Sequence, residues 1–428
     1  MPPSHPHSHG PDPDAPPPSP EVLTRRRRAV WLMLLLLVPV GLATVVGLVV
    51  LWPGDEPTRA EQAAELYLPP GTTYPEGRVS VVEPIDCSLP GGGGVPAQPL
   101  TCANVVVEVL DGDGAGEFRE LQLPAEVYAA GIEEGDVLVL TRDPAVEGEG
   151  QYAFFDYDRD VPIVALTVAF AVVVVAVARL RGLAALVGLA FAFTVMLQFL
   201  LPGLLGDSSP TMVSLVGSSA IMFVVLYLAH GFSARTTTAL VGTLFGLALV
   251  AVLGAVAVST ARLTGLTSEE TNTLNGFDPG IDFSGIVLAG VVVAGLGVLN
   301  DVTITQASAI WQLHEVDPGM TWRDLYRRGM VVGRDHIAST VYTIVFAYAG
   351  ASLPLLTLFE VYAQPWDVVL TSSALAEEVI RTLVGSIALV LAVPVTTAAG
   401  AFFAKAAGTA AGTATERRVT ALRARFAR

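Results

Sequence analysis

The chain has 428 residues, of which 52% are hydrophobic and 15% are charged, and its mean hydropathy is +0.58. A soluble domain carries about 25% charged residues, whereas the apolar residues here come in runs of about 20, the length that crosses a bilayer. These values exclude a soluble enzyme. The formal net charge of −16 belongs to one segment, because residues 53–160 hold 22 acidic and 5 basic residues. The chain offers no basic surface there, and we expect no nucleic-acid partner.

The N-terminal segment predicts a tail followed by an anchor. Residues 1–24 are rich in proline and histidine and contain almost nothing apolar, so we expect a disordered cytoplasmic tail. Its histidines have no Cys or carboxylate partner in a fixed geometry, and we predict no metal site. Four arginines at 25–28 then precede an apolar run at 30–52. The run is longer than the apolar part of a cleavable signal peptide, which predicts a transmembrane anchor helix over residues 25–52.

The acidic segment at 53–160 has the pattern of a small β domain. Short β-branched or alternating runs occur at 105–109, 117–123 and 137–140. The sequence Asp-Gly-Asp-Gly at 111–114 separates the first two and predicts a hairpin turn. We therefore expect a mostly antiparallel, extracytoplasmic β domain inserted between the first and second transmembrane helices.

The two cysteines of the chain, Cys87 and Cys102, both fall in this segment. They flank a loop rich in glycine and proline. Two cysteines in a segment expected outside the cytoplasm indicate a disulfide, and a pair of free buried thiols is the alternative.

Seven further apolar runs follow the β domain. They lie at residues 161–179, 183–201, 211–230, 239–258, 283–312, 338–359 and 379–403. With the anchor, they predict an α-helical polytopic membrane protein with eight transmembrane helices, comprising a seven-helix membrane domain at 161–404 and a basic cytoplasmic tail at 405–428. Arginines gather in alternate loops, and the loops between these are acidic. Because cytoplasmic loops are enriched in Arg and Lys, we expect both termini in the cytoplasm of a bacterial cell and the β domain outside its membrane.

The run at 283–312 contains a carboxylate near its middle, Asp301, preceded by Asn300. An Asp at the centre of a transmembrane helix costs about 2.5 to 3.5 kcal/mol on insertion scales, so it normally faces protein or water. Small and polar residues recur around it at steps of three or four, namely Gly290, Ala294, Gly297, Asp301, Thr305 and Ser308. We expect this stripe to pack against another helix and to point Asp301, Thr305 and Ser308 into the bundle, where the carboxylate can exchange protons. Alternatively, the helix ends at Leu299 and Asn300-Asp301 lies at the inner interface.

The segment between the sixth and seventh runs adds a second polar group. Thr321 and Asp324 predict a capping box at the start of a short amphipathic helix along the membrane surface. Arg334, Asp335 and His336 then directly precede the seventh run. They either pair with the Asn300-Asp301 region or form an interfacial cap, with a carboxylate at a helix N-terminus and Arg334 toward anionic lipid.

Three sequence blocks in this region carry a family resemblance. They are GLGVLNDVTITQAS at 295–308, GRDHIAST at 333–340 and AYAGASLP at 347–354. Together they resemble the YibE/F family of bacterial membrane proteins. The order of an anchor, a small outer domain ending near Asp-Tyr-Asp-Arg at 156–159 and a multi-span region is also similar to that family. The resemblance implies a multi-span membrane protein and assigns no substrate.

The layout around Asp301 is also similar, as an analogy, to the core of resistance-nodulation-division transporters, in which a central Asp carries the coupling proton. This chain has one such Asp where many of those transporters have two, and it has no intramembrane Lys.

These observations favour a secondary transporter or exporter, with proton coupling through Asp301. A membrane sensor or scaffold, with the β domain as its ligand-binding module, is the alternative. We expect no enzymatic activity, because an intramembrane aspartyl protease needs two carboxylates that share a proton, and we expect no cofactor or metal. The expected partners are the lipid bilayer and an unidentified solute. The candidate residues for transport or proton coupling are Asp301, Asn300, Thr305, Ser308, Asp335, His336 and Arg334.

Overall fold

The computed structural model describes residues 20–407 apart from positions 55, 66, 68–69, 89–98, 147 and 149, and it describes residues 20–29 and 407 by their backbone alone. The predicted tails at 1–24 and 405–428 lie outside the described residues except at their inner ends. The chain divides into two compact units. One is Pro57–Ala176, and the other combines Met1–Glu56 with Val177–Arg428.

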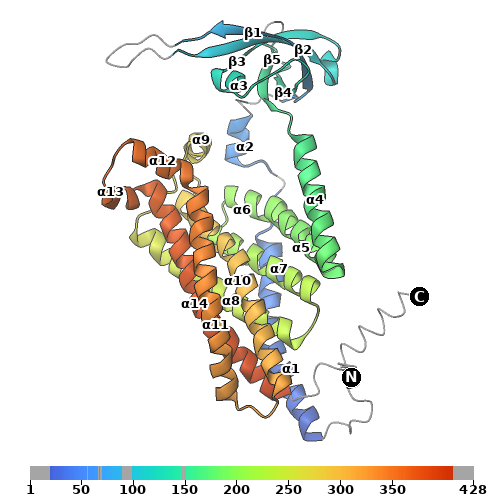
Figure 1. Ribbon diagram of the computed structural model, residues 1–428, viewed down its shortest axis with the longest axis vertical. Helices are drawn as coiled ribbons and strands as arrows, with labels where there is room; N and C mark the ends of the chain where they lie inside the picture. Colours follow the sequence, from blue (N-terminus) through green and yellow to red (C-terminus); the bar gives the residue numbers. More distant parts are fainter. Residues whose placement is uncertain are drawn as a thin grey trace, which may run out of the picture. The chain divides into compact units, whose positions relative to one another are not determined.

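The larger unit is a bundle of helices (Figure 1). Its helices are α1 (Pro20–Val50), α5 (Leu180–Val195), α6 (Leu201–Leu205), α7 (Pro210–His230), α8 (Ala234–Thr260), α9 (Glu269–Phe277), α10 (Phe283–Val316), α11 (Trp322–Ala351), α12 (Leu353–Val361), α13 (Trp366–Leu370) and α14 (Ser373–Ala407). A π-helical turn at Met196–Leu200 joins α5 to α6. Among the described residues, seven helices of the chain are long and apolar enough to cross a membrane, or eight if α11 and α12, which meet at a 61° bend, form one span. These helices correspond to the eight predicted apolar runs.

Helices α8, α10 and α14 pack against one another in all three pairings and form the centre of the bundle. Close packing depends on glycines that receive large side chains of α10. A Cβ added at Gly246 of α8 would lie 2.5 Å from Leu299 Cδ2, and one added at Gly254 would lie 2.7 Å from Leu288 Cδ1. On α11, Gly329 makes the same kind of close contact with Ile310. Small residues that admit a neighbouring helix are typical of helix packing in membranes.

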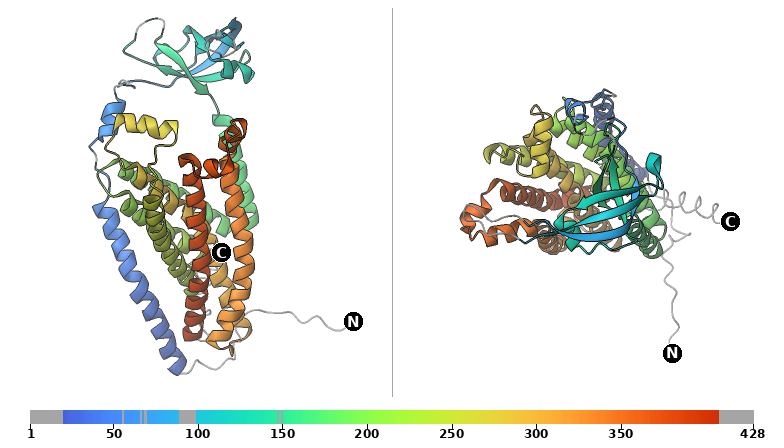
Figure 2. Two further views of the ribbon diagram at one scale, coloured as in Figure 1. Left: turned by 90° about the vertical axis from the view of Figure 1, so that its left-hand side faces the viewer. Right: turned by 90° about the horizontal axis from the view of Figure 1, so that it is seen from above.

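The smaller unit contains a five-stranded antiparallel sheet (Figure 2). The strand order is β3-β2-β1-β4-β5, and the two edge strands, β3 and β5, also contact each other, so the sheet curls into a half-barrel. Alternate residues such as Val105, Val107, Leu138 and Leu140 point into its core. The elements are α2 (Arg59–Ala64), β1 (Glu76–Asp86), β2 (Thr101–Val109), β3 (Phe118–Leu123), α3 (Ala125–Ala129), β4 (Val137–Arg142), β5 (Tyr152–Tyr157) and α4 (Asp160–Ala178).

The three runs expected as strands are confirmed as β2, β3 and β4, and the predicted turn at 111–114 contains a short 3-10 helix. Sequence reasoning missed β1 and β5. Strand β1 was hidden because it contains Pro84 and several charged residues, although it is the strand that pairs with both β2 and β4. Strand β5 is rich in aromatic residues, which are favoured in strands, so its composition could have predicted it.

The predicted disulfide between Cys87 and Cys102 is confirmed, with Cα atoms 5.8 Å apart. Cys87 directly follows β1 and Cys102 lies in β2, opposite Ile85. The bond therefore links neighbouring strands at the end of their ladder.

Removing this disulfide should destabilise the β unit. Closing a loop of 15 residues stabilises a fold by about 3 kcal/mol in the chain-entropy model. We expect Cys87→Ser, Cys102→Ser and the double variant to lower its free energy of unfolding equally, because each removes the same bond. Pulse proteolysis of the full-length protein in detergent measures this. Equal protease resistance of oxidised and reduced wild-type protein would contradict the expectation.

Candidate functional site

Asp301 lies near the middle of α10, with 18 residues of the helix before it and 15 after it. The helix continues without interruption to Val316, which excludes the alternative that it ends at Leu299. Two residues further on, the hydroxyl of Thr303 is 2.7 Å from that of Thr243 in α8. Asp301 therefore lies within α10 at the height of an interior turn of α8, and not at the end of either helix.

Among the described residues, the basic side chain within 4.0 Å of Asp301 is His336 of α11. Its Nε2 atom is 3.9 Å from Asp301 Oδ2, which allows an ion pair when the imidazole is protonated and is too long for a direct hydrogen bond. The two side chains are 26% and 71% exposed, respectively. Thus the structure brings together two titratable groups from two different helices.

The structure contradicts the expectation that Asp301 points into the bundle. Gly297, Asp301 and Thr305 lie on the exposed side of α10, and Ser308 is half-buried, with its hydroxyl donating to the carbonyl of Ile304 at 2.7 Å. The physical reason lies in the neighbouring helices. The glycines of α8 and α11 receive the large side chains of α10, so the large-residue face of α10 is buried. Of the predicted stripe, Gly297, Asp301 and Thr305 remain exposed, and Gly290, Ala294 and Ser308 are half-buried.

Asn300 is half-buried beside Asp301. Its Oδ1 atom is buried, and no described group donates a hydrogen bond to it. Arg334 and Asp335 are both exposed, and they do not join the pair formed by Asp301 and His336. Successive helical residues point about 100° apart, so one of these three consecutive side chains can face α10 while the others turn away.

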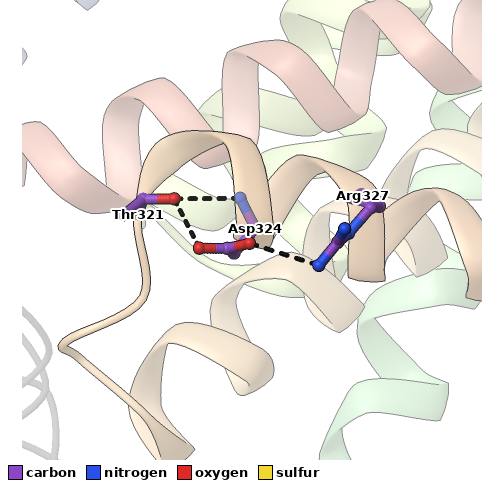
Figure 3. Close-up of polar contacts among 3 residues, drawn as sticks. All are labelled: Thr321, Asp324 and Arg327. Carbon is purple, nitrogen blue, oxygen red and sulfur yellow. Dashed lines mark hydrogen bonds and ion pairs between the residues drawn. The ribbon is translucent and has the colours of Figure 1, made fainter.

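Helix α11 also differs from the sequence expectation. The predicted capping contact is present, because Thr321 Oγ1 accepts from the backbone N–H of Asp324 at 3.2 Å, and Arg327 pairs with the Asp324 carboxylate at 3.4 Å (Figure 3). However, the expected surface helix and the seventh span form one helix, Trp322–Ala351. The segment between them contains no proline, and Gly329 and Gly333 contact α10 and α14, so packing carries the helix through Arg334 and His336. The predicted boundary was therefore wrong.

Sequence reasoning missed a buried polar group on the opposite side of α10. Gln306 is 2% exposed, and its Nε2 atom donates to Gly329 O at 2.9 Å and to Thr397 Oγ1 at 2.7 Å. It thereby links α10, α11 and α14. Its place in the sequence could have revealed it, because Gln306 falls on the same apolar face of α10 as Leu299 and Ile310. A polar side chain that is buried on such a face needs hydrogen-bond partners.

Surface clefts of the described residues include one that is lined by Arg262, Asp282 and neighbouring residues of α7, α8 and α10. Another is lined by Trp322, Arg323 and Arg327 at the start of α11. Asp301 lines neither cleft. Within the described part of the chain, no group of three His, Cys, Asp or Glu side chains could hold a metal ion.

The Asp-Tyr-Asp-Arg element forms a local ion pair at the end of β5. Arg159 Nη1 is 2.7 Å from Asp156 Oδ2, and the hydrogen bond from Arg159, aided by one from the backbone N–H of Tyr157, lowers the pKa of Asp156. The element covers the end of β5 and the residues directly before α4.

Comparison with known proteins identifies one family. Residues 166–406 match the family described as YibE/F-like protein. This range includes Asp301, His336 and Gln306. No curated protein and no solved structure is significantly similar to the chain.

The contribution of the buried Gln306 amide to stability can be measured by comparison with an exposed glutamine on the same helix. We expect Gln306→Leu to lower the free energy of unfolding by about 1 kcal/mol, because it removes the hydrogen bonds of the amide to Gly329 O and Thr397 Oγ1, and such hydrogen bonds average about 0.6 kcal/mol and reach about 1.7 in membranes. Gln312 is exposed, and Gln312→Leu should have no cost. Unfolding by a denaturing detergent in mixed micelles measures both. Equal stability of the two variants would show that the Gln306 contacts contribute nothing.

Proposed function

The chain belongs to the YibE/F-like family, and from this premise we propose that it is a polytopic protein of the bacterial cell membrane that acts as a secondary transporter or exporter, coupled to protons through Asp301 and His336. The proposal includes no enzymatic step, cofactor or resident metal. The observation that carries it is the approach of Asp301 to His336, at 3.9 Å, in the middle of two long helices.

The cost of Asp301 supports a functional role. A carboxylate in the middle of a transmembrane helix costs about 2.5 to 3.5 kcal/mol on insertion scales, and the buried contacts of α10 do not use it. Imidazole is the side chain that commonly changes charge between about pH 5 and 8. Protonation of either group changes the attraction between α10 and α11, which is how a bound proton can bias one arrangement of two helices over another.

The break after α11 also supports transport. Helix α11 carries His336, and it meets α12 at a 61° bend beside Ser352, with Pro354 in the first turn of α12. Interrupted helices are common next to the ion and solute sites of secondary transporters. His336 lies 16 residues before this bend in the same helix, so we expect a change in the bend angle to move the imidazole relative to α10.

The distribution of charge supports the orientation. Arg179 lies between α4 and α5, Arg181 lies in the first turn of α5, Arg235 lies at the start of α8, and Lys405 lies in the last turn of α14. The segment between α8 and α10, which contains α9, holds Glu269, Glu270, Asp278 and Asp282 against one basic residue, Arg262. Under the positive-inside rule, both termini are cytoplasmic and the β unit is extracytoplasmic, provided that α11 and α12 together form one crossing.

The proposal predicts that the charge of Asp301 is needed for function and not for folding. Asp301→Asn keeps the size of the side chain and removes the titratable group, so expression should stay near normal while complementation of a deletion strain fails. The measurement is growth on a panel of toxic solutes at two external pH values. His336→Gln should fail in the same way.

The matched control is Asp335→Asn, because Asp335 is exposed on α11 and does not belong to the ion pair of Asp301 and His336. It makes the same chemical change and should complement fully. Full complementation by Asp301→Asn at both pH values, with normal protein levels, would contradict proton coupling and favour a sensor or scaffold.

A further inference from the structure

We propose that Glu377 is a second proton-binding site of this protein, and that it is the outer proton site of the coupling proposed for Asp301. Glu377 lies in the second turn of α14, at the end of the bundle where α8 ends and α10 and α14 begin. That Glu377 binds a proton is independent of transport, whereas its part in coupling rests on the proposed function.

The Glu377 carboxylate is buried and only one of its two oxygens is hydrogen-bonded. The residue is 8% exposed, and its Oε2 atom accepts a hydrogen bond from Thr267 Oγ1 at 3.2 Å. The backbone N–H of Gly265 is near the carboxylate, but no described group completes a hydrogen bond to the buried Oε1 atom. Both neighbours are neutral. A carboxyl group in such surroundings either pairs with a cation or takes up a proton.

The one cationic side chain at this position is already paired. Among the described residues, the charged groups that act on the Glu377 carboxylate are Glu378 and Arg381, and Arg381 forms its ion pair with Glu378. Tyr348 of α11 also faces these two residues, and its phenol is neutral at pH 7. With Glu377 ionised, the group would therefore carry one uncompensated negative charge. One bound proton makes it neutral.

The ligand set fits a proton better than a metal ion. A proton needs one oxygen, and Glu377 Oε1 is available for it. Ca²⁺ and Mg²⁺ take about six oxygen ligands or more, whereas the second carboxylate here, Glu378, is held by Arg381. The described part of the chain also contains no group of three acidic, His or Cys side chains that could hold a metal ion.

The position of the ion pair relates this site to Asp301. A Cβ added at Gly290 of α10 would lie 3.6 Å from Arg381 Nη2, so the guanidinium lies against this glycine. Gly290 and Asp301 are separated by about three helical turns, or about 16 Å along the axis, and therefore lie on the same side of α10. Under the orientation proposed above, Glu377 is at the extracytoplasmic end of the bundle. An ionisable group at this depth is expected to have a function.

Infrared difference spectroscopy of the purified full-length protein tests the bound proton directly, because the C=O stretch of a carboxylic acid is separate from the bands of amides and carboxylates. At pH 7, the spectrum of wild type minus Glu377→Gln should contain a carboxylic acid band. Glu360→Gln is the matched control, because Glu360 is exposed on α12, and its difference spectrum should lack this band. Glu377→Asp should shift the band without removing it, which identifies the signal even if Glu377→Gln does not fold.

Two results of this experiment would overturn the proton site. One is a wild-type spectrum without a band that responds to Glu377→Gln or Glu377→Asp, since the carboxyl group would then be ionised. The other is a band that disappears when sodium chloride replaces choline chloride at constant pH, since a sodium ion would then occupy the site.

Complementation of the deletion strain tests the part of Glu377 in coupling. Glu377→Gln should fail to complement, as expected for Asp301→Asn, and Glu360→Gln should complement fully. Full complementation by Glu377→Gln with normal protein levels would overturn its part in coupling. Full complementation by Asp301→Asn, with the Glu377 band present, would instead contradict the proposed function and support Glu377 as a proton site that is independent of it.

Discussion

The packing of α10 against glycines of its neighbours is the interaction on which the rest of the bundle depends. In a membrane, apolar side chains gain little from leaving lipid, so helices associate where their surfaces fit closely. Leu288 and Leu299 fit over glycines of α8, and Ile310 fits over Gly329 of α11. These contacts fix the rotation of α10 about its axis, because they bury its large-residue face.

The position of Asp301 follows from this rotation. With Leu299 turned toward α8, Asp301 is directed to the other side of the helix, where its carboxylate lies 3.9 Å from the imidazole of His336 in α11. Gln306, on the buried side, ties the same helix to α11 and α14. Thus α10 presents a neutral, hydrogen-bonded amide inward and a titratable group outward.

Much of the fold could be predicted from the sequence, because long apolar runs and alternating strands are local patterns. The direction in which the Asp301 side chain points could not be predicted from the sequence. A stripe of small residues predicts close approach, but it does not say which helix approaches, and the glycines that α10 uses lie on α8 and α11. The length of α11 could not be predicted either. Arg334 and Asp335 are charged, which suggested the end of one helix and the start of another, but no proline interrupts the helix at these positions. Gln306 was overlooked because its partners, Gly329 and Thr397, are distant in sequence.

A double-mutant cycle between Gly246 and Leu299 tests the packing that sets this arrangement. Gly246→Ala should lower the free energy of unfolding by about 1 to 3 kcal/mol through overpacking, since its Cβ would lie 2.5 Å from Leu299 Cδ2. Combining it with Leu299→Ala removes the clash, so the double variant should be more stable than the sum of the single effects by about 0.5 to 3 kcal/mol. The measurement is unfolding in mixed micelles. Additive effects would show that Leu299 does not face Gly246, and the orientation derived for Asp301 would then be wrong.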